Sequence, residues 1–219
     1  MRRELNNFII ESDIKIDYFD DIVNHVLENE KRIFEFFELD NLPDKITIRI
    51  MSYDGFMEYA KEKNHKILGY ERGFSDYSMT IKLLNIDDQK KYTTHKNANL
   101  DEFKGTLLHE IIHKCQLLVK KFPRECIWFS EGLATNLSNQ FQYSICSLNE
   151  CDFNELVNNF NPSIMKLKYP YAYTIVNYIL NNYSKEEINR FIKDPNYLME
   201  KANILFEEAK EWTKNIIKK

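Results

Sequence analysis

The sequence predicts an α+β fold, with a small mixed sheet in the first half of the chain and a mainly helical second half. Isoleucine occupies alternate positions in residues 45–50, which is the pattern of a half-buried strand. Residues 77–84 are interpreted as a second strand. From residue 100 onward, apolar residues recur mainly at helical spacing. The 219 residues are enough to bury a sizeable core.

The first half is expected to alternate helices and strands. Residues 17–39 have helical periodicity, and the Asn-Leu-Pro-Asp run at 41–44 breaks it before the first strand. A short helix is expected over 56–63, followed by a turn region from Gly69 to Gly73. Residues 76–84 then supply the candidate edge strand of the sheet.

The second half is expected to begin with a long helix over residues 100–121. Asn99 is a suitable N-cap, and Glu102 stands three positions later, which approximates a capping box. Phe122 and Pro123 end this helix. The later helices are expected over 128–139, 171–183, 185–192 and 198–217, with Ser184 capping the third of these. We therefore divide the chain into sublobes at 1–121 and 122–219, with a cleft between them in a single domain.

The composition excludes several classes of protein. The 30 basic and 34 acidic residues give a net charge of −4, so nucleic acid is not an expected partner. The five glycines lack the spacing of a dinucleotide-binding or P-loop fingerprint. Neither a signal peptide nor a run of roughly 20 apolar residues is found, so we expect a cytoplasmic protein that does not enter membranes. The four cysteines have no zinc-knuckle spacing and are expected to be free thiols.

The most informative run of residues is His109-Glu110-Ile111-Ile112-His113, an H-E-x-x-H motif. On a helix, positions i and i+4 lie on the same face, so both imidazoles can reach one metal ion. Neutral imidazole is a good zinc ligand, and zinc lowers the pKa of its water to about 7. Glu110 can then accept the proton of that water. The motif predicts His109 and His113 as ligands of one zinc ion per chain and Glu110 as a general base.

A catalytic zinc ion needs a third protein ligand, and the sequence Trp128-Phe129-Ser130-Glu131-Gly132-Leu133-Ala134 offers one. Seventeen residues separate His113 from Glu131, enough for the first helix to end and a second to return. Together the two segments resemble the gluzincins, H-E-x-x-H metallopeptidases that include M1-type aminopeptidases, thermolysins and bacterial collagenase peptidase units. The resemblance implies a zincin-like fold with Glu131 as the third zinc ligand. Its specific part is residues 109–134.

Further site residues follow from the same resemblance. The run beginning at Pro170 is similar to the start of a helix in M1-type enzymes, where the tyrosine after the proline donates a hydrogen bond to the oxyanion. This assigns Tyr171 as a catalytic donor, with Tyr169 and Tyr173 as competitors. The G-x-M-E-N strand of the aminopeptidases is not found, so their specificity for a free amino terminus is not implied.

The remaining candidate residues have weaker support in the sequence. His95 is either a substrate contact or, as we favour, a loop or core histidine. Thr135 or Asn136 is a candidate hydrogen-bond partner for a zinc-bound histidine. Trp128 is expected to pack beneath the site. His25 and His65 have no motif context, so both are interpreted as surface or structural residues.

The sequence therefore predicts a zinc-dependent peptidase that acts on a peptide or protein substrate. Such a substrate would lie in the cleft as an extended chain paired with an edge strand. Two alternatives remain open: a zinc-binding regulatory or binding module of the same fold without peptide turnover, and a helical interaction protein without metal. The choice between endopeptidase and exopeptidase, the physiological substrate and the oligomeric state do not follow from the sequence.

Overall fold

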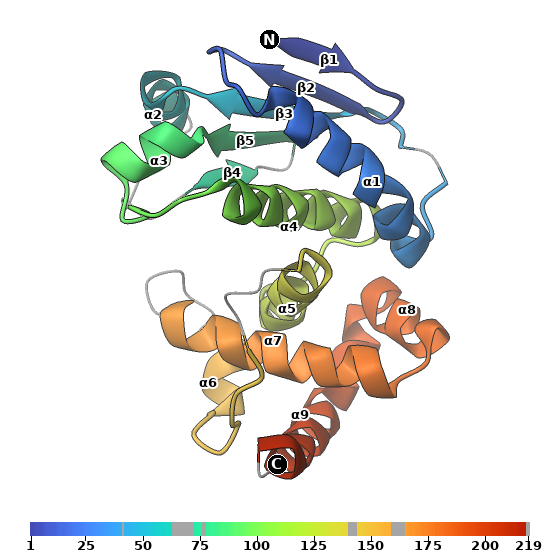
Figure 1. The fold of residues 1–219 in the computed structure, drawn as a ribbon. Coiled ribbons are helices and arrows are strands. Elements are labelled where there is room, and N and C mark those ends of the chain that lie inside the picture. The colour runs from blue at the N-terminus through green and yellow to red at the C-terminus, as the bar shows by residue number, and fades with distance from the viewer. Residues whose placement is uncertain (41, 63–71, 76–77, 140–143, 159–164, 218–219) are drawn as a thin grey trace. The chain divides into compact units, whose positions relative to one another are not determined.

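The computed structural model describes residues 1–40, 42–62, 72–75, 78–139, 144–158 and 165–217 (Figure 1). The chain has an α+β architecture and divides into two compact units, Met1–Lys114 and Cys115–Lys219. The expected α+β class, with a small mixed sheet and a mostly helical remainder, is confirmed. No helix among the described residues is long and apolar enough to cross a membrane.

The first unit is built on a mixed sheet with the strand order β1-β2-β3-β5-β4 (Figure 1). The three central strands, β2 (Phe8–Ser12), β3 (Ile46–Met51) and β5 (Thr80–Leu84), run parallel. The edge strands, β1 (Arg2–Glu4) and β4 (Gly73–Ser75), pair antiparallel with β2 and β5. The expectation that residues 76–84 form an edge strand is therefore wrong, because β4 lies outside β5.

The core of this unit is formed by the side chains that alternate along the central strands. Register pairs such as Ile10 with Ile48 and Ile50 with Leu83 lie in one layer across the sheet. They belong to a set that solvent does not reach: Phe8, Ile10, Ile46, Ile48, Ile50, Ile81 and Leu83. In β2 and β3 this alternation leaves the other set of side chains more accessible, as a strand period of two requires, whereas β5 also buries Lys82 and Leu84.

Helices complete the first unit. Helix α1 (Phe19–Phe37) connects the parallel strands β2 and β3 and buries an apolar face. Helices α2 (Tyr53–Glu62) and α3 (Ile86–Tyr92) are shorter, and the Asn85 side chain caps α3 by accepting a hydrogen bond from the Asp88 amide at 3.1 Å. Helix α4 (Leu100–Val119) continues past the boundary into the second unit.

The regular elements in the described part of the second unit are all helical. A 3-10 turn, η1 (Arg124–Cys126), leads into α5 (Ile127–Leu137). The remaining elements are α6 (Phe153–Asn158), α7 (Met165–Asn182), α8 (Lys185–Lys193) and α9 (Pro195–Ile217). The predicted cap of α8 is confirmed, because the Glu187 amide donates to Ser184 Oγ at 3.3 Å.

The packing of α5 on α7 dominates this unit (Figure 1). Gly132 is the point of closest approach: an added Cβ would lie 2.4 Å from Val176 Cγ2 and 2.6 Å from the Ala172 carbonyl oxygen. A polar link reinforces the contact, since Asn136 Nδ2 donates to the Tyr173 carbonyl at 3.0 Å and Asn177 Nδ2 donates to Asn136 Oδ1 at 2.8 Å. The backbone that carries Glu131 is therefore held against α7.

Candidate metal centre

The H-E-x-x-H motif lies in the middle of α4, as its periodicity predicts. The helix begins where the capping signal indicates, because the Glu102 amide donates to Asn99 Oδ1 at 2.9 Å. Its apolar face is buried, with exposed fractions of 2% or less at Phe103, Leu107, Leu108, Ile111, Ile112 and Cys115. This burial fixes the rotation of the helix about its own axis and so determines the direction of the two histidines.

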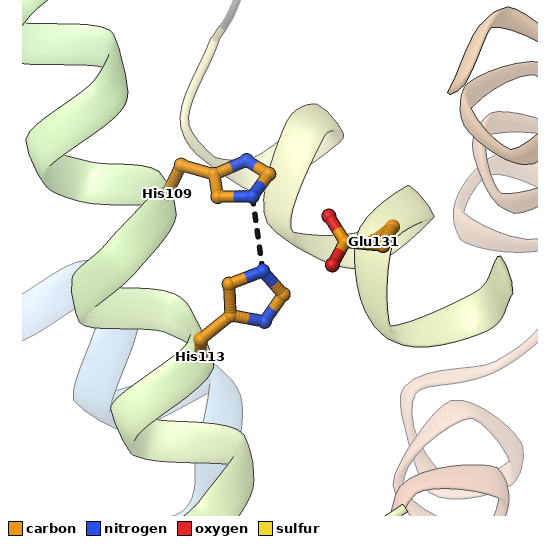
Figure 2. A group of neighbouring side chains, drawn as sticks. All are labelled: His109, His113 and Glu131. Atoms are coloured by element: carbon orange, nitrogen blue, oxygen red, sulfur yellow. Dashed lines mark hydrogen bonds between the residues drawn. The ribbon is translucent and has the colours of Figure 1, made fainter. Parts of the chain in front are cut away.

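The two histidines of the motif face each other along one side of α4 (Figure 2). Their Nε2 atoms are 2.9 Å apart, and their rings lie edge to face with centroids separated by 4.6 Å. His109 is buried, with 8% of its surface exposed. Two Nε2 atoms that converge on one point are the arrangement that a shared metal ion requires.

Glu131 joins this pair from α5. One ligand atom from each of His109, His113 and Glu131 lies within 4.8 Å of the others (Figure 2). Local sequence explains why α5 begins where it does: Pro123 is extended, and the Cys126 amide donates to the Pro123 carbonyl at 3.0 Å to close the turn that precedes α5. The structure thus brings together all three residues that the sequence predicted as metal ligands.

The donor set matches the requirements of a catalytic zinc ion. Two imidazole nitrogens and one carboxylate oxygen are ligands that zinc accepts, and three protein ligands leave a position for water or substrate. In tetrahedral zinc, two ligand nitrogens are roughly 3.3 Å apart, given Zn–N bonds of about 2.0–2.1 Å. The observed Nε2–Nε2 separation of 2.9 Å is shorter than that value and within hydrogen-bonding distance, so the two rings would move slightly apart to share an ion. These residues therefore fit the ion that the motif predicts.

The residues beside the two histidines also have defined positions. Glu110 follows His109 on α4 and is half-buried. Lys114 follows His113, and although it is charged, only 1% of its surface is exposed. Its ammonium group donates to the Ser78 carbonyl at 2.6 Å, so this charge is directed toward the segment that leads into β5. A lysine directly after the second histidine is thus accommodated by a part-buried hydrogen bond.

The tyrosines of α7 are placed differently from the expectation. Helix α7 begins at Met165, so Pro170 lies inside the helix and not at its start. Burial raises the pKa of Tyr171, and the charges that raise it further belong to Cys151, Cys146 and Glu150. Within the described residues, Tyr171 makes no hydrogen bond to the three candidate ligands.

The other candidates have structural partners. Thr135 Oγ1 donates to the Glu131 carbonyl at 2.8 Å, and Asn136 bonds to Gly132 and to α7, so neither bonds to a candidate histidine ligand in the part of the chain described. Trp128 is fully buried and packs edge to face on Phe129 and Phe153.

Among the described residues, His25, His95 and the four cysteines do not belong to the cluster. His95 Nδ1 lies 2.9 Å from Arg72, which also pairs with Glu102 at 2.8 Å, so the loop interpretation of His95 agrees with the structure. Burial lowers the pKa of His25. His65 lies outside the described residues. The four cysteines are free thiols, as predicted.

Sequence reasoning missed one pair of residues in this region. Gln116 is buried on α4, and its side-chain amide exchanges two hydrogen bonds with Ser130, the residue before Glu131. A glutamine among apolar neighbours in the last turns of a helix was the available signal, since a buried amide needs partners.

A comparison with models of known protein families gives no match, and neither does a comparison with curated proteins. The assignment of function therefore depends on the chemistry of the residues themselves.

Proposed function

We propose that this chain is a zinc-dependent peptidase with a gluzincin-type, zincin-like catalytic fold. The observation that carries the proposal is the convergence of His109, His113 and Glu131, whose ligand atoms lie within 4.8 Å of one another. The sequence predicted all three residues as ligands of one ion. Their ligand atoms lie close together, although seventeen positions separate His113 from Glu131. If the H-E-x-x-H run were a chance occurrence on a surface helix, a glutamate from another helix would not be expected next to its two histidines.

The chemistry assigned to each residue follows from its type and place. A zinc ion held by the three ligands would act as a Lewis acid and lower the pKa of a coordinated water to about 7. Glu110, next to the first ligand, takes a proton from the attacking water and delivers it to the leaving amine. Tyr171 is the oxyanion donor that the family resemblance implies, and Tyr169 and Tyr173 are its competitors. The substrate is a peptide or protein.

Cleavage of a broad peptide pool tests this function. The purified protein loaded with one equivalent of zinc should generate new amino termini, detected by mass spectrometry, and a chelator should stop the reaction. The matched control is Glu110→Gln, which removes the base but keeps a side chain of the same size. Equal product formation by the variant and the wild type would show a contaminating peptidase and contradict the proposal.

A zinc-binding module without turnover is the second candidate function. It predicts that the protein takes up zinc through the same three ligands and leaves every peptide in the pool intact. The same experiment therefore separates the two functions. A helical interaction protein, the third possibility, would bind no zinc.

A further inference from the structure

Gln116 and Ser130 form a part-buried, reciprocal pair that joins α4 to α5. Gln116 Nε2 donates to the Ser130 carbonyl at 2.9 Å, and Ser130 Oγ donates to Gln116 Oε1 at 2.6 Å. Only 2% of the Gln116 surface is exposed. Both functional atoms of the amide are engaged, so the pair has a single favourable alignment, and a slide of one helix along the other would break both bonds.

The position of this pair relates it to the candidate metal centre. Gln116 follows His113 by three residues on the same helix, which is about one turn. Ser130 directly precedes Glu131 on α5. The two hydrogen bonds therefore tie the backbone next to the third ligand to the helix that carries the first two. Neither residue belongs to the three-residue ligand cluster.

We propose that Gln116 is a positioning residue, which, acting through Ser130, holds the Glu131 carboxylate where it can share an ion with His109 and His113. The inference rests on the proposed zinc function. A ligand that must be placed within about 0.5 Å needs support from residues behind it, and loss of such support typically weakens metal binding about 10- to 100-fold. Here the support reaches the ligand through the backbone of α5, because the bond that fixes it is made to the Ser130 carbonyl.

Zinc affinity, measured by competition with a chromophoric chelator, tests the assignment. Gln116→Met keeps the side-chain volume but removes both hydrogen bonds, and Ser130→Ala removes the bond from the hydroxyl. Gln116→Met should weaken zinc binding about 10- to 100-fold, and Ser130→Ala, which keeps the bond to the carbonyl of residue 130, should weaken it by less. Ser130→Thr keeps the hydroxyl and should retain most of the affinity.

A matched control separates positioning from stability. Gln89 is also a buried glutamine, 1% exposed, and its Nε2 donates to the Leu84 carbonyl at 2.6 Å in the first unit. Gln89→Met should lower the free energy of unfolding yet leave zinc affinity unchanged. Urea unfolding of each metal-free variant shows whether the protein is folded under the conditions of the zinc titration.

The decisive comparison uses a Glu131→Ala background. If Gln116 acts through Glu131, then Gln116→Met should cause no further loss of zinc affinity once Glu131 is absent. If the folded Gln116→Met and Ser130→Ala proteins both bind zinc with wild-type affinity, the inference is overturned, but the proposed zinc site is not. An equal loss with and without Glu131 would also overturn it. A wild-type protein that binds no zinc would instead contradict the proposed function, and the inference with it.

Discussion

The Nε2 atoms of His109 and His113 lie 2.9 Å apart, within hydrogen-bonding distance, on one side of α4 (Figure 2). In the proposed function Glu110, which follows His109 on this helix, is the base. We predict that Glu110→Gln keeps one zinc per chain and lowers kcat by at least about 100-fold, the lower limit for general-base catalysis. Metal analysis and peptide assays on one preparation check both parts. A variant that loses its zinc would identify Glu110 as a ligand instead.

Gly132 allows α5 to approach α7, and its substitution should reverse the usual effect of removing a helical glycine. Glycine to alanine in an exposed helix stabilises a protein by about 1 kcal/mol. Here the new methyl group would lie 2.4 Å from Val176 Cγ2 and 2.6 Å from the Ala172 carbonyl oxygen. Gly132→Ala should therefore destabilise the protein by about 1–3 kcal/mol, as overpacking does. Urea unfolding measures this change, and a stabilised variant would refute the packing argument.

Substitution of the tyrosines of α7 identifies which of them is the proposed oxyanion donor. Following the family resemblance, we predict that Tyr171→Phe lowers kcat by about 100- to 1,000-fold without loss of zinc, as removal of one oxyanion donor does. Tyr169→Phe and Tyr173→Phe are the matched controls and should keep most of the activity. If one of the controls loses activity and Tyr171→Phe does not, the donor is that other residue.

Stability should decrease at alkaline pH because of buried thiols. Burial raises the pKa of Cys126 from its ordinary value of 9.0 to about 12, with a smaller effect from the charge of Glu125. The stabilisation is complete below pH 9 and is lost as pH rises toward 12, because the unfolded chain releases the proton first. Between these values the free energy of unfolding should fall by about 1.4 kcal/mol per pH unit for this thiol.

Urea unfolding of the wild type and of Cys126→Ala across pH 8–11 measures this contribution. In the variant, the free energy of unfolding should fall less steeply with rising pH than in the wild type, whatever the stability of the variant at neutral pH. Parallel slopes would show that Cys126 releases its proton at the same pH in the folded and unfolded chains.

Where local signals agree with packing, the sequence was sufficient to predict the structure. The α4 helix has a capping residue at Asn99, apolar residues at helical spacing and the metal motif on one side, and all of these lead to the same element. The cluster of His109, His113 and Glu131 was predictable in two steps: the i, i+4 spacing places the two histidines on one side of α4, and the family resemblance indicated Glu131.

Where tertiary contacts decide, the sequence was insufficient. Strand β2 was missed because Phe8–Ser12 is short, and its pairing with β3 is set by contacts distant in the chain. The start of α7 was placed too late because proline is normally found in the first turn of a helix, whereas Pro170 is inside this one. The pair of Gln116 and Ser130 could not be predicted because polar partners across two helices depend on their relative register.

The zinc content of the protein, purified without added metal or chelator, tests the central claim most directly. We predict about one zinc per chain in the wild type, loss of that zinc in Glu131→Ala, and its retention in Glu125→Ala, a control that removes an exposed glutamate from the turn before α5. After dialysis against micromolar zinc, the wild type should hold one zinc per chain, whereas Glu131→Ala should not. A wild-type protein that neither contains zinc nor takes it up would contradict the account.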